Sequence, residues 1–117
     1  MATPKVLTAD EIDAALKTLP DWKRDGGAIV ASYAFASFRD ALALIVRVGF
    51  EAEELNHHPE IVNVYNRVAF KLSTHDAGDA VTERDIALAG RISAAARPLL
   101  AARRGVAGSA GRIPPHR

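Results

Sequence analysis

Residues 53–75 read EELNHHPEIVNVYNRVAFKLSTH, and this stretch decides how the chain folds. Pro59 has no backbone N–H and disfavours the helical conformation at the residue before it, so it ends a preceding helix. Two alternating runs follow at 60–65 and 67–74, on either side of Asn66, which tolerates the left-handed turn conformation. The stretch therefore predicts a helix end followed by a β-hairpin.

Three of the four histidines of the chain, His57, His58 and His75, lie in this stretch. The hairpin returns its second strand toward Pro59, so His75 is expected close to the other two. Glu53 precedes His57 by four residues on the helix, where a carboxylate can orient an imidazole. Because histidine exchanges a proton near neutral pH, the cluster predicts a proton-transfer site or a metal site.

Each of these residues also has a purely structural interpretation, as an alternative to a proton-transfer or metal site. Consecutive histidines can cap a helix C-terminus, His75 can be a loop residue, and Asp85 can serve only in a helix cap. Tyr65 reads as a sheet aromatic with its hydroxyl at the edge. Neutral imidazoles also bind zinc, but adjacent histidines suit one tetrahedral ion poorly and the HExxH spacing is absent.

The flanking sequence supplies the other elements. Capping boxes, in which a hydroxyl and an acid three residues later satisfy free N–H groups, open three helical patterns: Thr8…Glu11, Ser37…Asp40 and Thr82…Asp85. The predicted helices span 9–19, 38–55 and 83–102, with Pro98 expected to kink or end the last. Strands at 22–24 and 28–35 flank the turn Asp25-Gly26-Gly27. The order αββαββα predicts an α+β fold: a four-stranded antiparallel sheet with three helices on one face.

Composition limits the classes of function. The net charge of +1 provides no basic field for nucleic acid. The absence of cysteine excludes disulfides, iron–sulfur clusters and thiolate zinc sites. No apolar run is long enough to predict a membrane span or a signal peptide, so we expect a cytoplasmic protein. Residues 1–102 are predicted to form one domain, and the glycine-, proline- and arginine-rich residues 103–117 a flexible basic tail.

The run Glu53-x-x-x-His57-His58-Pro59, with Tyr65, His75 and Asp85 after it, resembles the pterin-4a-carbinolamine dehydratase family over residues 7–96. The resemblance implies the αββαββα fold and a homodimer or homotetramer formed by joining sheets and helices. It also implies dehydration of 4a-hydroxytetrahydrobiopterin to quinonoid dihydropterin without a metal or cofactor. The family's residues map to catalytic positions at His57, His58, His75 and Glu53, and to substrate-binding positions at Asn56, His58, Ser73, Thr74 and Asp85.

The residue types suit that reaction, because loss of water needs one proton delivered to a hydroxyl and one removed from the ring nitrogen system. A group with a pKa near 7 can do either, contributing ~10²–10⁴-fold. The hypothesis is that His57 and His75 exchange protons with the 4a-hydroxyl, His58 binds the pterin and Glu53 orients His57. Asn56 stands where some relatives have an acid, which leaves the orientation of the imidazoles open.

The family also implies partners. An aromatic amino acid hydroxylase, which makes the carbinolamine, is the expected functional partner. The alternative function is an oligomeric interaction module, the dimerisation cofactor of a transcription regulator, in which catalysis is not required. The intact set of three histidines favours catalysis, because a scaffold alone does not need it.

Overall fold

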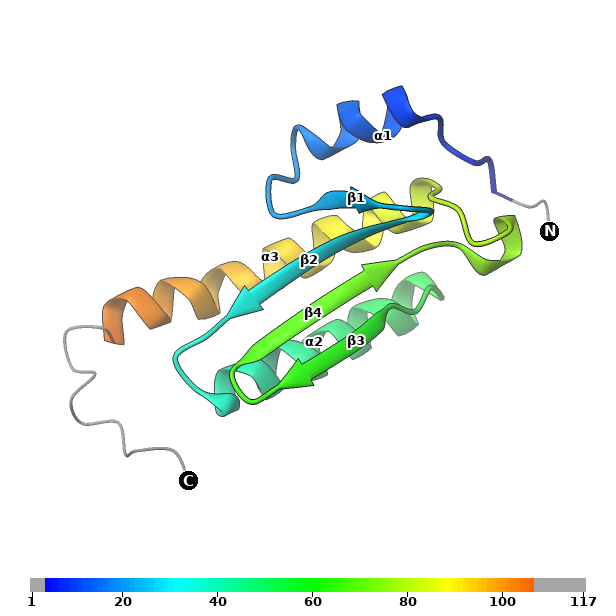
Figure 1. Cartoon of the computed structure of the whole chain (residues 1–117). Helices are drawn as coiled ribbons and strands as arrows, with labels where there is room; N and C mark the ends of the chain where they lie inside the picture. Colours follow the sequence, from blue (N-terminus) through cyan, green and yellow to red (C-terminus); the bar gives the residue numbers. More distant parts are fainter. Residues whose placement is uncertain (1–3, 107–117) are drawn as a thin grey trace.

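A computed structural model of the protein describes residues 4–106. A four-stranded antiparallel sheet has the order β1-β2-β4-β3, and α2 and α3 run side by side along one face of it, with α1 beside β1 (Figure 1). The elements are α1 (Ala9–Leu16), β1 (Lys23–Asp25), β2 (Ala28–Ala34), α2 (Phe38–Leu55), β3 (Glu60–Val64), β4 (Arg67–Leu72), the 3₁₀ turn η1 (His75–Ala77) and α3 (Glu83–Val106). The predicted α+β class and element order are confirmed. Residues 107–117 of the predicted tail lie outside the described residues.

Helix α2 has the predicted bounds, and its two ends explain why. At the start, Ser37 Oγ accepts a hydrogen bond from the backbone N–H of Asp40. At the other end Asn56 adopts the left-handed conformation (φ 50°, ψ 45°), which asparagine tolerates better than most residues. The next N–H, that of His57, returns to the carbonyl of Ala52 at 3.0 Å. This cap turns the chain sharply and places the two adjacent histidines just beyond the helix.

The β3–β4 hairpin brings the far end of β4 back to the end of α2. Glu60 pairs with Lys71 and Val64 with Arg67, so residues after Leu72 emerge next to Pro59. The turn differs from the prediction in one respect, since the left-handed residue is Tyr65 (φ 52°) and not Asn66. The Asn66 side chain instead donates from Nδ2 to the carbonyl oxygen of Phe35 at 2.8 Å, which ties the turn to the end of β2.

The outer helices depart from their predicted bounds. Helix α1 ends at Leu16, and the residues up to Pro20 form tighter turns, with the N–H of Leu19 bonded to the carbonyl of Leu16. Pro98 was expected to kink or end helix α3. The helix continues through it to Val106, so an early end is wrong, and the helix enters the segment predicted as a tail. Leu99 and Leu100 pack against the core beyond the proline, which offsets its missing N–H bond.

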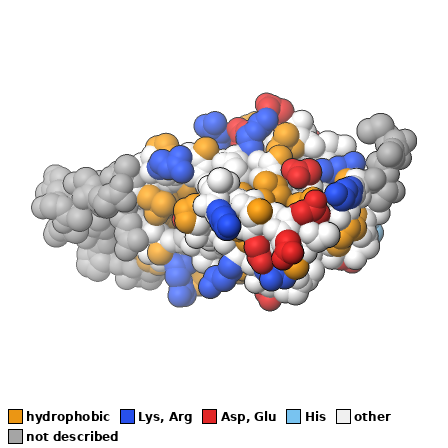
Figure 2. All heavy atoms as spheres, turned by 90° about the horizontal axis from the view of Figure 1, so that it is seen from above, with side chains coloured by type: hydrophobic (Ala, Val, Ile, Leu, Met, Phe, Trp, Pro, Cys, Tyr) orange, Lys and Arg blue, Asp and Glu red, His pale blue; other side chains and the backbone are white. Residues whose placement is uncertain are grey.

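The core lies between the sheet and the helices, and it contains the side chains of Ile29, Phe70, Leu44, Leu88 and Ile92. On the face seen in Figure 2, basic and acidic side chains are interspersed with apolar ones. Within the described residues, no helix has the length and apolar character to cross a membrane.

Helix α2 also carries a second apolar row, which faces away from the core. We call it the α2 outer row; its side chains are 42–69% exposed and recur at four-residue steps: Phe38, Leu42, Val46 and Phe50. On β3, which pairs along one side with β4, Val62 and Val64 are also more than half exposed. These two surfaces are therefore apolar and exposed, outside the hydrophobic core.

Candidate active site

An open pocket of about 290 Å³ lies where the end of α2, the end of β4 and the start of α3 meet. The structure brings His57, His58 and His75 together in its wall, as the hairpin geometry predicted. The lining is otherwise polar and comes from all three of these chain segments: Asn56, Ser73, Thr74, Asp76 and Arg84.

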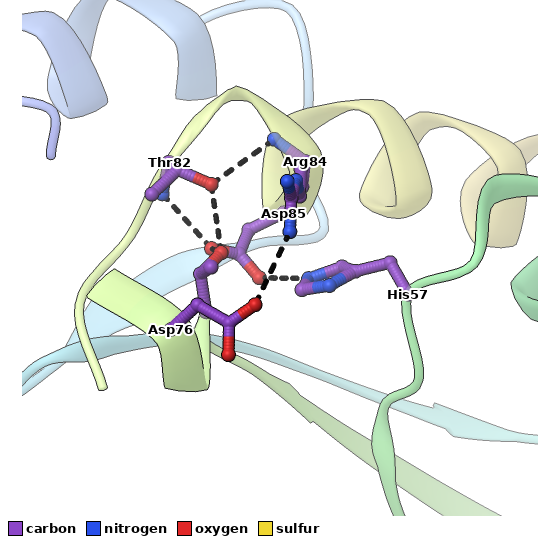
Figure 3. A network of polar contacts seen from close by, with 6 residues as sticks. His57, Asp76, Thr82, Arg84 and Asp85 are labelled. Carbon is purple, nitrogen blue, oxygen red and sulfur yellow. Dashed lines mark hydrogen bonds and ion pairs between the residues drawn. The ribbon is translucent and has the colours of Figure 1, made fainter. Parts of the chain in front are cut away.

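His57 is held by a buried carboxylate on α3. Its Nε2 atom lies 2.6 Å from Oδ1 of Asp85, His57 is 8% exposed and Asp85 is fully buried (Figure 3). The other carboxylate oxygen, Oδ2, accepts the hydroxyl hydrogen of Thr74 at 2.8 Å and the backbone N–H of Thr82 at 2.9 Å. Both oxygens of Asp85 are therefore satisfied within the protein, as a buried charge requires.

This arrangement fixes which nitrogen of His57 carries the hydrogen. An ionised carboxylate only accepts hydrogen bonds, so Nε2 donates to it and the neutral ring has its lone pair on Nδ1. Nδ1 has no hydrogen-bond partner among the described residues. Every fully buried side-chain nitrogen or oxygen in that part of the chain does have a partner, so Nδ1 is not fully buried and is open to solvent. His57 and Asp76, both labelled in Figure 3, line the same pocket. The Asp85 contact thus leaves the lone pair of Nδ1 available on a histidine that lines the pocket.

Glu53 has a different partner from the predicted one. Its Oε1 atom lies 3.0 Å from Nε2 of His58, and both side chains are more than half exposed. The left-handed Asn56 interrupts the helix, so the four-residue spacing does not carry across it to His57. The prediction that Glu53 orients His57 is wrong, and Asp85 takes that position.

The remaining predicted residues divide into exposed and buried ones. The His75 side chain is 91% exposed, and its Nδ1 atom lies 3.1 Å from Oδ1 of Asp79. Thr74 is 2% exposed, and its hydroxyl hydrogen is already bonded to Asp85. Asp85 has no exposed surface through which to make its predicted contact with a substrate, because its carboxylate is enclosed with His57.

Sequence reasoning missed three residues of this region. Asp76 and Arg84 line the pocket and face each other, with 3.9 Å between Arg84 Nη1 and Asp76 Oδ2. Thr82 was predicted only as a helix cap, yet its hydroxyl lies 2.7 Å from that of Thr74. Asp76 follows His75 and Arg84 precedes Asp85 in the sequence, which is the one signal available for these two residues. In the described part of the chain, no group of three or more His, Asp or Glu side chains is arranged to hold a metal ion.

Comparisons with known proteins show the family to which the chain is related. The sequence profile described as pterin 4 alpha carbinolamine dehydratase matches residues 5–95. A relative from Opitutus terrae, provisionally named pterin-4-alpha-carbinolamine dehydratase, is 49% identical over 88 residues, which are 75% of this chain and 91% of the relative. A relative of the same provisional name from Burkholderia multivorans is 50% identical over 97 residues, 79% of this chain and 94% of the relative.

Solved structures share the fold. A transcriptional coactivator/pterin dehydratase from Brucella melitensis superposes with a TM-score of 0.75 at 38% identity, over 79% of this chain and 99% of that one. A pterin dehydratase-like protein identified as a RuBisCO assembly factor in the alpha-carboxysome has a TM-score of 0.53 at 24% identity, over 64% of this chain and 86% of that one, and shows likeness of fold alone. The chain belongs to the pterin 4 alpha carbinolamine dehydratase family.

Proposed function

We propose that this protein dehydrates pterin-4a-carbinolamine, 4a-hydroxytetrahydrobiopterin, to quinonoid dihydropterin by histidine acid–base catalysis. The observation that carries the proposal is the pocket wall in which His57, fixed by Asp85, stands with His58 and His75. Family membership supplies the substrate class. Three imidazoles at one pocket suit a reaction that moves two protons and needs no change of oxidation state.

The reaction breaks the bond between C4a and the hydroxyl oxygen, which leaves as water after taking a proton from an acid. The lone pair of N5 forms the C4a=N5 double bond, and the N5 proton passes to a base. Nδ1 of His57 is the base in this proposal, because the Asp85 contact leaves that lone pair available. His75, on the exposed side of the pocket, delivers the proton to the hydroxyl.

His58 and the pocket rim bind the pterin in this proposal. His58 lines the pocket and, like its partner Glu53, is exposed, so it can contact the polar edge of a flat heterocycle. Asn56 and Ser73 line the same pocket and provide further hydrogen-bonding groups. Asp85 and Thr74 act behind His57, as positioning groups that do not touch the substrate.

A direct test follows the decay of freshly generated carbinolamine by stopped-flow ultraviolet absorbance, with and without the protein. The proposal predicts that decay accelerates with protein concentration, and that the acceleration survives a chelator and is lost in His57→Ala. Asp10→Ala, on the first turn of α1, is a matched control that leaves the pocket unchanged. Decay at the spontaneous rate with folded protein would refute the assignment.

The proposal places the enzyme in the cytoplasm beside an aromatic amino acid hydroxylase, which produces a carbinolamine during each turnover. It also includes assembly of the chain into a homodimer or homotetramer. The α2 outer row and the exposed valines of β3 support self-association, because a second copy can pack the same apolar surface against them. In this proposal a second copy of the chain covers the α2 outer row.

A second candidate function uses the same surface. The Brucella melitensis neighbour is called a transcriptional coactivator as well as a pterin dehydratase, and the α2 outer row is an apolar face able to contact another protein. In this alternative the chain is an oligomeric interaction module, the dimerisation cofactor of a transcription regulator. The absence of dehydratase activity in a stably folded oligomer would favour it over the enzyme.

A further inference from the structure

A second pocket lies between the loop that follows α1 and one face of α3. Its volume is about 560 Å³, within the range of roughly 300–1,000 Å³ that is typical of small-molecule sites. Residues 18–21 of the loop form one wall, and residues at three- and four-residue steps on α3 form the other: Gly90, Ser93, Ala94, Arg97 and Leu100. The histidine pocket shares no lining residue with this one.

A buried chain of hydrogen bonds ends at the carboxylate of Asp21 in this pocket. Tyr33 is 5% exposed, and its hydroxyl donates to Oδ2 of Asp21 at 2.9 Å. Because the Tyr33 hydrogen is used there, the Ser93 hydroxyl, 3.2 Å away, is the donor to the Tyr33 oxygen. Ser93 Oγ accepts from Nε1 of Trp22 at 2.9 Å. The chain holds the carboxylate in place through Oδ2, and Oδ1 has no hydrogen-bond partner among the described residues.

Arg97 gives the same pocket a positive charge. Its guanidinium makes no hydrogen bond or ion pair with any other described residue, Asp21 included. Arg97 nevertheless lies near the Tyr33 hydroxyl, since burial raises the pKa of Tyr33 and the charge of Arg97 partly opposes that rise. The pocket therefore contains one anion and one cation near the same hydroxyl, and neither neutralises the other. A ligand complementary to both carries both charges itself.

Gly90 keeps the helix side of the pocket open. Glycine in the interior of a helix lowers stability relative to alanine. A Cβ at position 90 would meet no neighbouring atom within 4 Å, so packing within the chain gives no reason for a glycine there. Ala94, one turn further along α3, adds only a methyl group to the same wall. Together these two residues leave room for a ligand against the helix, with apolar surface from Leu19 and Leu100 beside it.

We propose that this pocket is a second ligand site, which binds a free α-amino acid with an apolar side chain. The ammonium group pairs with Asp21, the carboxylate pairs with Arg97, and the apolar side chain lies against the open wall at Gly90. A peptide terminus brings only one of the two charges, and a phosphate brings only negative charge, so neither complements both side chains. The proposal does not depend on the proposed function, because the two pockets share no lining residue.

Trp22 provides a reporter at the site, because it is the one tryptophan of the chain and its indole N–H bonds to Ser93. The test titrates the full chain with L-leucine, L-methionine and L-phenylalanine and follows the ¹H–¹⁵N signal of the indole. We expect a saturable shift with at least one of them. A shift of the His57 ring signals with none at Trp22, or no saturable shift at all, would overturn the proposal.

Two analogues of the tightest-binding amino acid test the pairing of charges. The amine that lacks the carboxylate and the acid that lacks the ammonium group should each bind roughly tenfold more weakly, because each leaves one charge of the pocket without a partner. An amine that binds as tightly as the amino acid would reduce the site to a cation site. An acid that does so would reduce it to an anion site, and either result would overturn the proposal.

Variants separate binding from folding. Arg97→Gln and Asp21→Asn should each weaken binding roughly tenfold, whereas Arg39→Gln, which removes another unpaired cation from α2, should not. Gly90→Leu fills the pocket and should abolish binding without lowering the melting temperature, because leucine is the better helix former. Gly49→Leu is its matched control, since Gly49 lies in α2 with the same open space at its Cβ. Undiminished binding in Gly90→Leu or in Arg97→Gln would overturn the proposal.

Discussion

Replacing Asp85 with asparagine tests the central contact of the site with almost no change in shape. Oδ2 of Asp85 accepts two donors, the Thr74 hydroxyl and the Thr82 N–H, so in Asp85→Asn the new amide oxygen must take that position. The amide NH₂ then faces Nε2 of His57, which has to accept. The ring hydrogen moves to Nδ1, and the lone pair proposed to take the substrate proton is lost.

The expected fall in kcat follows from the loss of the Nδ1 lone pair as a base, whereas the expected stability follows from the buried hydrogen bonds that are kept. A positioned general base contributes ~10²–10⁴-fold, and a wrong histidine tautomer in a comparable His–Asp pair costs about 10⁴-fold. We therefore expect kcat of Asp85→Asn to fall by roughly 10²–10⁴-fold, with little change in KM, because Asp85 is buried away from the pocket. Since each buried hydrogen bond can be remade with the other tautomer, the free energy of unfolding should fall by only about 1 kcal/mol.

The assay is stopped-flow dehydration at several substrate concentrations, paired with urea unfolding of the same preparation. Asp40→Asn is the matched control, because Asp40 occupies the third position of α2 as Asp85 does in α3 and contacts no histidine. Wild-type kcat in a folded Asp85→Asn protein would refute the reasoning. So would a loss of kcat accompanied by an equal loss in Asp40→Asn.

Three further predictions concern residues outside this contact. Glu53→Gln should lower kcat/KM by at most about tenfold in the stopped-flow assay, since a contact between two exposed side chains contributes little. Burial raises the pKa of Tyr33, so the stability it contributes below its ordinary pKa of ~10 is lost as the pH rises above that value. Tyr33→Phe should abolish that alkaline loss in urea unfolding; an unchanged pH profile would contradict it. Val46→Lys in the α2 outer row should shift sedimentation toward the monomer, whereas Val6→Lys, also exposed, should not.

Much of the fold could be predicted because local signals and long-range pattern agree along most of the chain. Ser37 caps α2 and Pro59 follows its end, so both bounds were predicted correctly. The failures have local causes. Pro98 suggested an early end to α3, but the leucines beyond it pack on the core and the helix continues. Asn66 was a reasonable candidate for the left-handed turn residue, and its side-chain bond to Phe35 was not predictable from spacing.

The sequence predicted which residues meet at the site better than it predicted which side chains bond to each other. The hairpin places His75 in the same pocket as His57 and His58. The partners depend on one backbone angle, since the left-handed Asn56 directs His58 toward Glu53 and His57 toward Asp85. Helical spacing cannot anticipate such a change of direction. Thr82 was overlooked because a capping role already explained its hydroxyl.

The measurement that tests the account most directly is the rate of carbinolamine decay with wild-type protein and with His57→Ala, in excess chelator. If His57 is the proton acceptor, decay with the wild type is faster than the spontaneous rate, and the acceleration is reduced by ~10²-fold or more in the variant. Equal acceleration by both proteins, each shown to be folded, would contradict the assignment of His57 as the proton acceptor. Spontaneous decay with both would contradict the enzyme itself.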